Sequence, residues 1–231
     1  MLKKTKHTKL IILIDPDKYN PQLIEIANQC KVAYIFVGGS SLTKNNFNAT
    51  VKSIKSKTTI PVIIFPGDET QVSKLANGML ILSLLSGRNS DYLIGKHVLA
   101  AQKIKASKLI TIPTGYILID GGKQSVTQKV TKTTALQSSK MIINTAIAGE
   151  LLGKQLIYLE AGSGAKKTIL PAIIKQVKRK INVPLIVGGG INSVAKAKTI
   201  IASKPDYMVV GNALEINPNF LLDLNSLFIT K

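Results

Sequence analysis

Short apolar runs alternate with longer amphipathic stretches along the whole chain. The apolar runs are rich in leucine and β-branched residues and have the length of buried strands; they span residues 10–14, 34–37, 62–65, 79–84, 109–112, 156–159, 185–187 and 207–210. The stretches between them have helical spacing and span residues 21–30, 45–56, 92–106, 133–152, 168–180, 193–202 and 219–228. This alternation predicts an α/β protein with a parallel sheet whose outer face is covered by helices.

Eight such units indicate a closed (β/α)₈ barrel, and a doubly wound open sheet is the alternative fold. Because no linker or shift in composition interrupts the chain, we predict a single domain over residues 1–231. Residues 66–78 are too few for more than a short helix between two strands, so the third helix is expected to be short or missing. Residues 109–120 hold two apolar runs separated by Pro113, Thr114 and Gly115, which fits either an extended strand or a loop.

The composition narrows the class of protein. At 231 residues and 45% hydrophobic content the chain can bury a full core. No apolar run reaches the ~18–20 residues that a membrane span needs, and the charged start has no signal peptide pattern. The single cysteine, Cys30, excludes an internal disulfide framework. We therefore expect a cytoplasmic protein without a membrane span.

The net charge of +19 raises the question of a polyanionic partner. Only Arg88 and Arg179 among the 31 basic residues are arginine, the aromatic content is 5%, and tryptophan is absent. Proteins that read nucleic acid favour arginine forks and exposed aromatic rings. We therefore predict no nucleic-acid partner, and assign the lysines to solvated faces that also attract an anionic substrate.

In a barrel of this kind the site residues follow the carboxyl ends of the strands. The residues after the first five runs are polar or small: Asp15-Pro16-Asp17-Lys18, Gly38-Gly39-Ser40-Ser41, Pro66-Gly67-Asp68, Ser86-Gly87-Arg88-Asn89 and Pro113-Thr114-Gly115-Tyr116. The last three runs end in glycine-rich turns, with Gly162, Ser163 and Gly164, then Gly188 to Gly190, then Gly211 and Asn212. Backbone N–H groups at successive strand ends suit a phosphate, so we predict a phosphate cup here.

Glu160 leaves a buried run beside these glycines. A buried carboxylate is unfavourable unless it is paired or used, so a general-base or hydroxyl-orienting role is favoured over a structural one. Tyr158 shares its face of the strand by alternation and is a candidate hydrogen-bond partner for a substrate, or else a buried barrel tyrosine.

Asp15 and Ser40 end two adjacent strands. Asp15 is a helix N-cap, with Pro16 at the first helical position, a metal ligand, or an acid or base. Ser40 could supply a hydroxyl to the same Mg²⁺, whose remaining ligands would come from substrate phosphates and water. Arg88, with Asn89 beside it, is expected to contact a second anionic group, a diphosphate, although a surface arginine is the alternative.

Taken together, these residues resemble the geranylgeranylglyceryl phosphate synthase family, which includes heptaprenylglyceryl phosphate synthases. The resemblance rests on the first-strand Leu13-Ile14-Asp15-Pro16-Asp17-Lys18, the turns at Gly38 and Ser86, the segment Pro113-Thr114-Gly115-Tyr116, the run Tyr158-Leu159-Glu160-Ala161-Gly162-Ser163-Gly164, and the later glycines. It implies a prenyltransferase that forms an ether bond between sn-glycerol 1-phosphate and a polyprenyl diphosphate and releases diphosphate. The lipid product would bring the enzyme into transient contact with a membrane.

By the same resemblance, Asp15 and Ser40 would hold magnesium, and Glu160 would take the proton from the attacking hydroxyl. The glycerol phosphate would be bound by Tyr158, Leu159, Glu160, Ala161, Gly162, Ser163, Gly164, Gly189, Gly190, Gly211 and Asn212. Leu13 stands where some family members have a lysine that contacts glycerol phosphate, so the chain resembles the branch with an apolar residue there.

Geranylgeranyl diphosphate is the expected prenyl substrate and heptaprenyl diphosphate the alternative. Family members form dimers or hexamers, so we expect a homo-oligomer. Two other functions stay open: a catalytically inactive barrel that binds phosphate or a polyanion, and an isomerase that uses Asp15 as a second acid or base.

Overall fold

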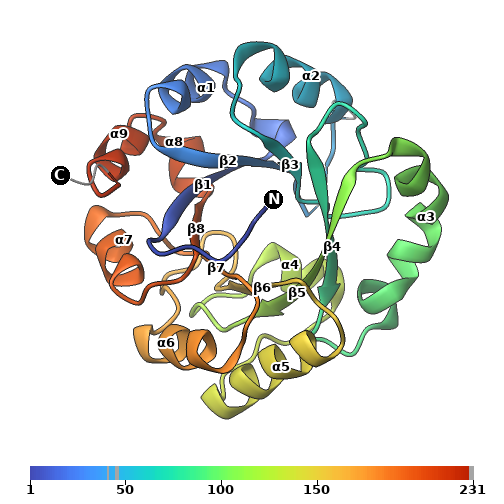
Figure 1. Ribbon diagram of the computed structural model, residues 1–231, viewed down its shortest axis with the longest axis vertical. Coiled ribbons are helices and arrows are strands. Elements are labelled where there is room, and N and C mark those ends of the chain that lie inside the picture. Colours follow the sequence, from blue (N-terminus) through green and yellow to red (C-terminus); the bar gives the residue numbers. More distant parts are fainter. Residues whose placement is uncertain (41, 45–46, 229–231) are drawn as a thin grey trace.

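Eight parallel strands close into a barrel in the computed structural model, which describes residues 1–40, 42–44 and 47–228 (Figure 1). The strands are β1 (Lys9–Ile14), β2 (Val32–Val37), β3 (Val62–Ile64), β4 (Gly78–Leu84), β5 (Ile110–Leu118), β6 (Leu156–Glu160), β7 (Leu185–Gly188) and β8 (Tyr207–Val210). Each pairs with the next, and β8 pairs with β1. The predicted barrel is confirmed and the open sheet is excluded.

Helices surround the barrel in an outer ring, except that the short helix α4 (Val126–Thr131) lies inside this ring in the view of Figure 1. They are α1 (Pro21–Asn28), α2 (Phe47–Lys57), α3 (Lys96–Ser107), α4 (Val126–Thr131), α5 (Ser139–Leu151), α6 (Pro171–Lys180), α7 (Val194–Ile201), α8 (Asn212–Ile216) and α9 (Phe220–Asn225), with a 3₁₀ turn η1 (Pro16–Lys18) and a π-helical turn η2 (Asp91–Gly95). Ser41, Asn45 and Asn46, which the sequence placed at the end of the second strand and the start of the second helix, lie outside the described residues. None of the helices in the described ranges has the length and apolar run needed to cross a bilayer.

Several helices start where a side chain caps them. Asn20 accepts a hydrogen bond from the backbone N–H of Gln22 at the start of α1, and Ser193 accepts one from Lys196 at the start of α7. The predicted helix over 133–152 begins later, at Ser139, because Ser138 is its N-cap. The residues before it instead include the short helix α4, which the apolar periodicity missed.

The connection between β3 and β4 contains no helix, as expected. Its buried Gln71 replaces helical packing with hydrogen bonds. The Gln71 amide donates to the carbonyl of Gly39 (2.8 Å) and accepts from the N–H groups of Gly39 (3.3 Å) and Gly67 (3.2 Å). This holds the loop against the carboxyl end of β2, and a loop thus takes the place of a helix between β3 and β4.

The two apolar runs between 109 and 120 form one strand. Strand β5 passes straight through Pro113, Thr114 and Gly115 and pairs with β4 on one side and β6 on the other. Residues 113–116 therefore lie within β5. Their predicted place, after the end of the strand, is wrong. Tyr116 lies in the core inside the barrel.

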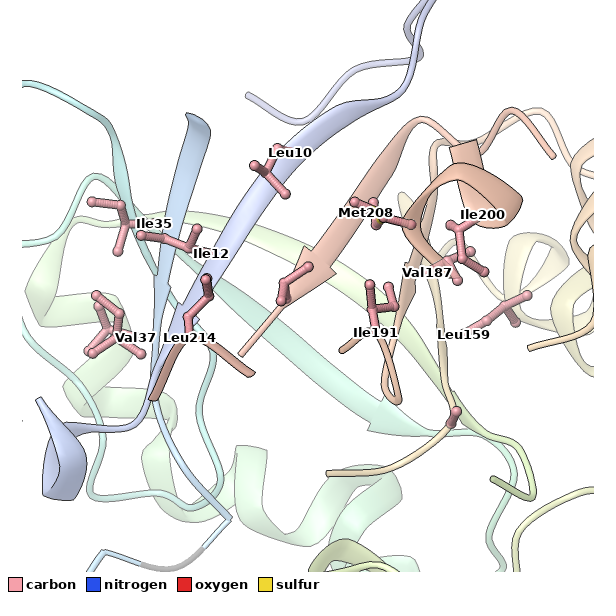
Figure 2. Packing of buried hydrophobic residues seen from close by; sticks show 14 of the residues in the cluster. Leu10, Ile12, Ile35, Val37, Leu159, Val187, Ile191, Ile200, Met208 and Leu214 are labelled. Atoms are coloured by element: carbon pink, nitrogen blue, oxygen red, sulfur yellow. The ribbon is translucent and has the colours of Figure 1, made fainter. Parts of the chain in front are cut away.

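Alternation along the strands divides the core into two layers. Ile11, Phe36 and Tyr158 belong to the cluster inside the barrel. Their neighbours Leu10 and Ile12, with the residues labelled in Figure 2, belong to the layer between the strands and the helices. Because both faces of each strand are buried, the strands read as continuous apolar runs in the sequence.

Residues near the amino terminus close the amino-terminal end of the barrel. Leu2 is buried with the inner cluster. Asp206, fully buried before β8, accepts hydrogen bonds from the N–H groups of Thr5 (2.7 Å) and Leu185 (2.8 Å) and pairs with Lys178. With this end closed, the carboxyl end of the strands is left to hold a site.

Candidate active site

A cavity of about 460 Å³ opens at the carboxyl end of the barrel. The predicted site residues that line it are Asp15, Ser40, Tyr158, Glu160, Ser163, Gly164, Gly189, Gly190, Gly211 and Asn212. They come from the ends of β1, β2, β6, β7 and β8, which are far apart in the sequence. The barrel thus brings most of the predicted residues together around one space.

Glu160 is the last residue of β6 and is buried. Its Oε1 accepts a hydrogen bond from the backbone N–H of Gly162 (2.7 Å). Burial raises the pKa of the carboxyl to about 7, although the Gly162 hydrogen bond and the neighbouring Tyr158 hydroxyl act in the opposite direction. A carboxylate with such a pKa can accept and release a proton near neutral pH, which suits a general base.

Tyr158 lies two residues before Glu160 and points to the same inner face. Its ring packs against Tyr116 and Phe65, with centroids 5.3 and 5.5 Å away. Its buried hydroxyl makes no regular hydrogen bond to any described protein atom. Burial, together with the charge of Glu160, raises the pKa of Tyr158 well above its ordinary value.

The Tyr158 hydroxyl therefore stays protonated and available as a donor. Leaving a buried hydroxyl unpaired costs ~1–3 kcal/mol, and a ligand in the cavity would remove that penalty. A side chain at Gly188 would place a Cβ 2.5 Å from the Tyr158 hydroxyl and 2.9 Å from Glu160 Oε2. The glycine leaves room for both side chains.

The glycine-rich turns form the predicted cup. Gly189 has φ +87° and Gly190 has φ +71°, both in the left-handed region that favours glycine. A Cβ on Gly189 would lie 2.4 Å from Glu160 Oε1. Across the cavity mouth, the Ser163 hydroxyl donates to Asn212 Oδ1 (2.9 Å) and joins the turn after β6 to the turn after β8. The three turns thus surround one space with backbone N–H groups and small polar side chains.

Three predicted site residues do not line the cavity: Leu159, Ala161 and Gly162. Leu159 and Ala161 lie in the outer layer of the core, so their side chains point away from the cavity. Gly162 acts through its N–H, which holds Glu160. These three residues support the site through the backbone and through packing.

Asp15 is an N-cap and also lines the cavity, and its role as a metal ligand stays a prediction. Its Oδ1 accepts a hydrogen bond from the N–H of Asp17 (3.0 Å) and caps η1. The side chain also lines the cavity, and burial raises its pKa. Ser40, across the Gly39 turn, shares a hydrogen bond with the hydroxyl of Thr127 (3.3 Å).

Hard oxygen donors of this kind fit magnesium, which takes few protein ligands when phosphates and water supply the rest. Within the described chain, no hydrogen bond engages the second oxygen of the Asp15 carboxylate. No cluster of three or more His, Cys, Asp or Glu side chains suited to a metal occurs among the described residues. A metal here would therefore depend on ligands from the substrate.

Arg88 and Asn89 lie away from this cavity. They line a separate open hollow with Lys132 and the residues that precede α5. The Arg88 guanidinium donates to the carbonyls of Leu85 (3.3 Å) and Gly87 (2.8 Å) in its own turn, and the Asn89 amide donates to the carbonyl of Thr131 (3.1 Å). The geometry gives these residues a role in shaping the turn after β4, and their contact with a diphosphate stays a prediction.

An apolar groove adjoins the polar cavity and shares Gly39, Ser40, Phe65, Tyr116 and Thr127 with it. Its walls come from β4 and the inner side of α3, together with the loop that replaces the third helix, and include Leu80, Leu82, Leu84, Tyr92, Ala100 and Ile104. Lys96 and Glu69 form an ion pair (2.7 Å) along it. A long apolar chain could lie in the groove with a polar head in the cavity.

A model of the PcrB family matches residues 3–225. The chain belongs to this family. It is 46% identical over 223 residues to geranylgeranylglyceryl phosphate synthase from Zunongwangia profunda, which covers 93% of this chain and 95% of the relative. It is 42% identical over 219 residues to the enzyme of the same name from Chitinophaga pinensis, covering 92% and 87%.

The fold agrees with that membership. The crystal structure of (S)-3-O-geranylgeranylglyceryl phosphate synthase from Thermoplasma acidophilum, solved with its substrate sn-glycerol 1-phosphate, superposes with a TM-score of 0.89. The two chains are 30% identical, and the match covers 95% of this chain and 91% of the other. The resemblance drawn from the strand-end residues of this PcrB family chain is confirmed.

The sequence analysis did not propose Thr127 for the PcrB family site, and it proposed Tyr116 only as a residue after the end of a strand. Thr127 reaches the cavity from α4, and Tyr116 reaches it from inside β5. A signal for α4 was present: Ser125 and Gln128 form a capping box, in which each side chain bonds to the other's backbone N–H. Tyr116 was among the candidates after the fifth apolar run, but it reaches the cavity from within the strand, because β5 continues through Pro113.

Proposed function

We propose that this chain is a magnesium-dependent prenyltransferase that joins the C3 hydroxyl of sn-glycerol 1-phosphate to geranylgeranyl diphosphate. The products are 3-O-geranylgeranyl-sn-glyceryl 1-phosphate and diphosphate. The proposal is supported by three features of the structure that adjoin one another. A buried carboxylate with a pKa of about 7 lies between a glycine cup and the start of an apolar groove.

The polar cavity suits the glycerol phosphate. The N–H groups around Gly189, Gly190 and Gly211 suit the phosphate, and Ser163 and Asn212 add side-chain hydrogen bonds. This arrangement places the other end of the glycerol toward Glu160 and Tyr158. A cup with fixed donors around a chiral glycerol would distinguish the 1-phosphate from its 3-phosphate enantiomer.

Glu160 acts as the general base in the reaction. It takes the proton of the C3 hydroxyl, whose oxygen bonds to C1 of the prenyl chain. The bond from C1 to the diphosphate breaks in the same step, and diphosphate leaves with the electron pair. Tyr158, neutral because of its raised pKa, donates a hydrogen bond that fixes the position of the hydroxyl or of Glu160.

Asp15 and Ser40 would hold magnesium at the edge shared by the cavity and the groove. Bound there, the ion would neutralise the charge of the diphosphate. The groove would hold the prenyl chain against Leu80, Leu84 and Ile104, and exclusion of water by these side chains would protect the reacting C1. The names of the relatives favour geranylgeranyl, and heptaprenyl diphosphate is the alternative substrate.

The test is release of diphosphate from geranylgeranyl diphosphate by purified protein with magnesium, comparing sn-glycerol 1-phosphate with the 3-phosphate. We expect release with the 1-phosphate alone. Faster release with heptaprenyl diphosphate would keep the reaction and change the substrate. Absence of release at every prenyl length would favour the inactive, polyanion-binding barrel.

Asp15→Asn should raise the magnesium concentration needed for half-maximal release by ~10-fold or more, because a neutral amide binds the ion weakly. Asp223→Asn, exposed on α9, is the matched control and should leave the titration unchanged. An unchanged titration in Asp15→Asn would make Asp15 a cap only. Assembly into a dimer or hexamer stays a prediction, which light scattering would measure.

A further inference from the structure

Helix α3 exposes apolar side chains on the side that faces away from the barrel. Ile94, in the turn that leads into the helix, is 62% exposed, Val98 is 66% exposed and Leu99 is 70% exposed. Figure 1 shows α3 at the outer edge of the molecule beside β4. Such a cluster on one helix is more than the scattered surface leucines that any protein carries. We call it the outer face of α3, made by Ile94, Val98 and Leu99 with Lys105.

Positive charge surrounds this face. Between Asp91 and Asp120 the chain has no acidic residue, and Lys103, Lys105 and Lys108 are exposed along the helix and at its end. Helix α3 itself has no carboxylate, and the exposed Asp91 begins the turn that precedes it. Its exposed apolar residues and flanking lysines fit the boundary between the headgroups and acyl chains of an anionic bilayer. A symmetric contact with the same face of a second copy would instead bring lysines against lysines in a chain of net charge +19.

The opposite side of α3 belongs to the apolar groove. Ala100, the buried residue of the helix, and Ile104 line it. A helix is ~10 Å across, so a bilayer in contact with the outer face would lie within one helix width of the groove. A lipid leaving or entering the groove would travel a short distance to the acyl chains.

We propose that the outer face of α3 docks on an anionic phospholipid bilayer and holds the groove beside it. Docking itself depends only on this surface; its purpose, the exchange of a prenyl substrate and a lipid product, rests on the proposed function. Electrostatic attraction brings the lysine-rich helix to the membrane, and insertion of Val98 and Leu99 keeps it there.

Co-sedimentation with vesicles tests the proposal. We expect the protein to bind vesicles of phosphatidylcholine mixed with phosphatidylglycerol, to bind pure phosphatidylcholine weakly, and to be released by high salt. Leu99→Gln combined with Lys105→Gln should weaken binding ~10-fold or more, because the pair loses one inserted side chain and one charge. Leu222→Gln combined with Lys198→Gln is the matched control on α9 and α7, across the barrel from α3, and should bind as the wild type does.

Several outcomes would overturn the proposal. Equal binding to both kinds of vesicle, no binding to either, or the same loss in both double variants would remove α3 as the docking surface. Light scattering of the α3 variant gives a separate readout: dissociation of an oligomer would assign the face to a second copy of the chain. Diphosphate release with detergent-dispersed substrate should be the same in both variants and the wild type. If wild-type protein binds anionic vesicles but releases no diphosphate, the proposed function fails while docking stands.

Discussion

Replacing Glu160 by glutamine should make the protein more stable at alkaline pH. Burial raises the pKa of this carboxyl to about 7 from an ordinary 4.5, so the folded chain holds the proton more tightly than the unfolded chain does. The stability that Glu160 contributes is therefore fully present only at pH values below the unfolded pKa. It declines as pH rises from there to about 7, and the loss is complete above the folded pKa.

The size of the effect follows from the two pKa values. Each tenfold change in proton affinity corresponds to ~1.4 kcal/mol, so the separation between them corresponds to ~3 kcal/mol. Glutamine carries no charge at any pH, and its amide oxygen can still accept the hydrogen bond from Gly162. Glu160→Gln should thus gain up to ~3 kcal/mol of unfolding free energy at a pH of about 8, and little at a pH of about 5.

Urea denaturation followed by circular dichroism at a series of pH values would measure this gain. Glu25→Gln, exposed on α1, is the control and should change stability by no more than ~0.5 kcal/mol at any pH. A Glu160→Gln variant that is less stable at alkaline pH, or whose gain does not depend on pH, would refute the reasoning. The side chain would then not be a buried base with a raised pKa.

Three further predictions concern the site and its support. Turnover should fall as pH drops below about 7, because protonated Glu160 cannot take a proton, and a flat profile through that range would argue against its role as base. Gly189→Ala should raise the KM for glycerol phosphate ~10-fold or more, because its Cβ would lie 2.4 Å from Glu160 Oε1; Gly153→Ala, with similar φ (+80°) and open space around its Cβ, should leave KM unchanged. Asp206→Asn should lower the unfolding free energy by ~3 kcal/mol, since it leaves Lys178 without its partner, and a loss under ~1 kcal/mol in urea titration would show that the pair contributes little.

The sequence determined the architecture because the strand pattern is local. A barrel strand is buried on both faces, so runs such as 156–159 and 207–210 had to be continuously apolar, and their spacing gave the number of units. The site residues at the strand ends followed from the same rule, since Asp15, Glu160 and Gly189 stand directly after or at the end of such runs.

The tertiary structure decided the features that depend on contacts between residues far apart in the sequence. Strand β5 continues through Pro113 because β4 and β6 pair with it on both sides, and this puts Tyr116 beside Tyr158. The Arg88 guanidinium donates to a carbonyl of its own turn, and this turn lines a hollow separate from the cavity. No sequence motif indicates either fact. Composition likewise could not show that the lysines and exposed apolar residues of α3 meet on one outer face.

The chemistry of the site also came from its surroundings. A glutamate at the end of an apolar run is visible in the sequence, but its pKa of about 7 comes from burial among chain segments far apart in sequence. The same packing buries the Tyr158 hydroxyl beside Glu160, where it makes no regular hydrogen bond to a described residue. Local sequence thus placed Asp15, Glu160 and the glycines at strand ends, whereas long-range packing added Tyr116 and Thr127 to the cavity and determined the protonation of its side chains.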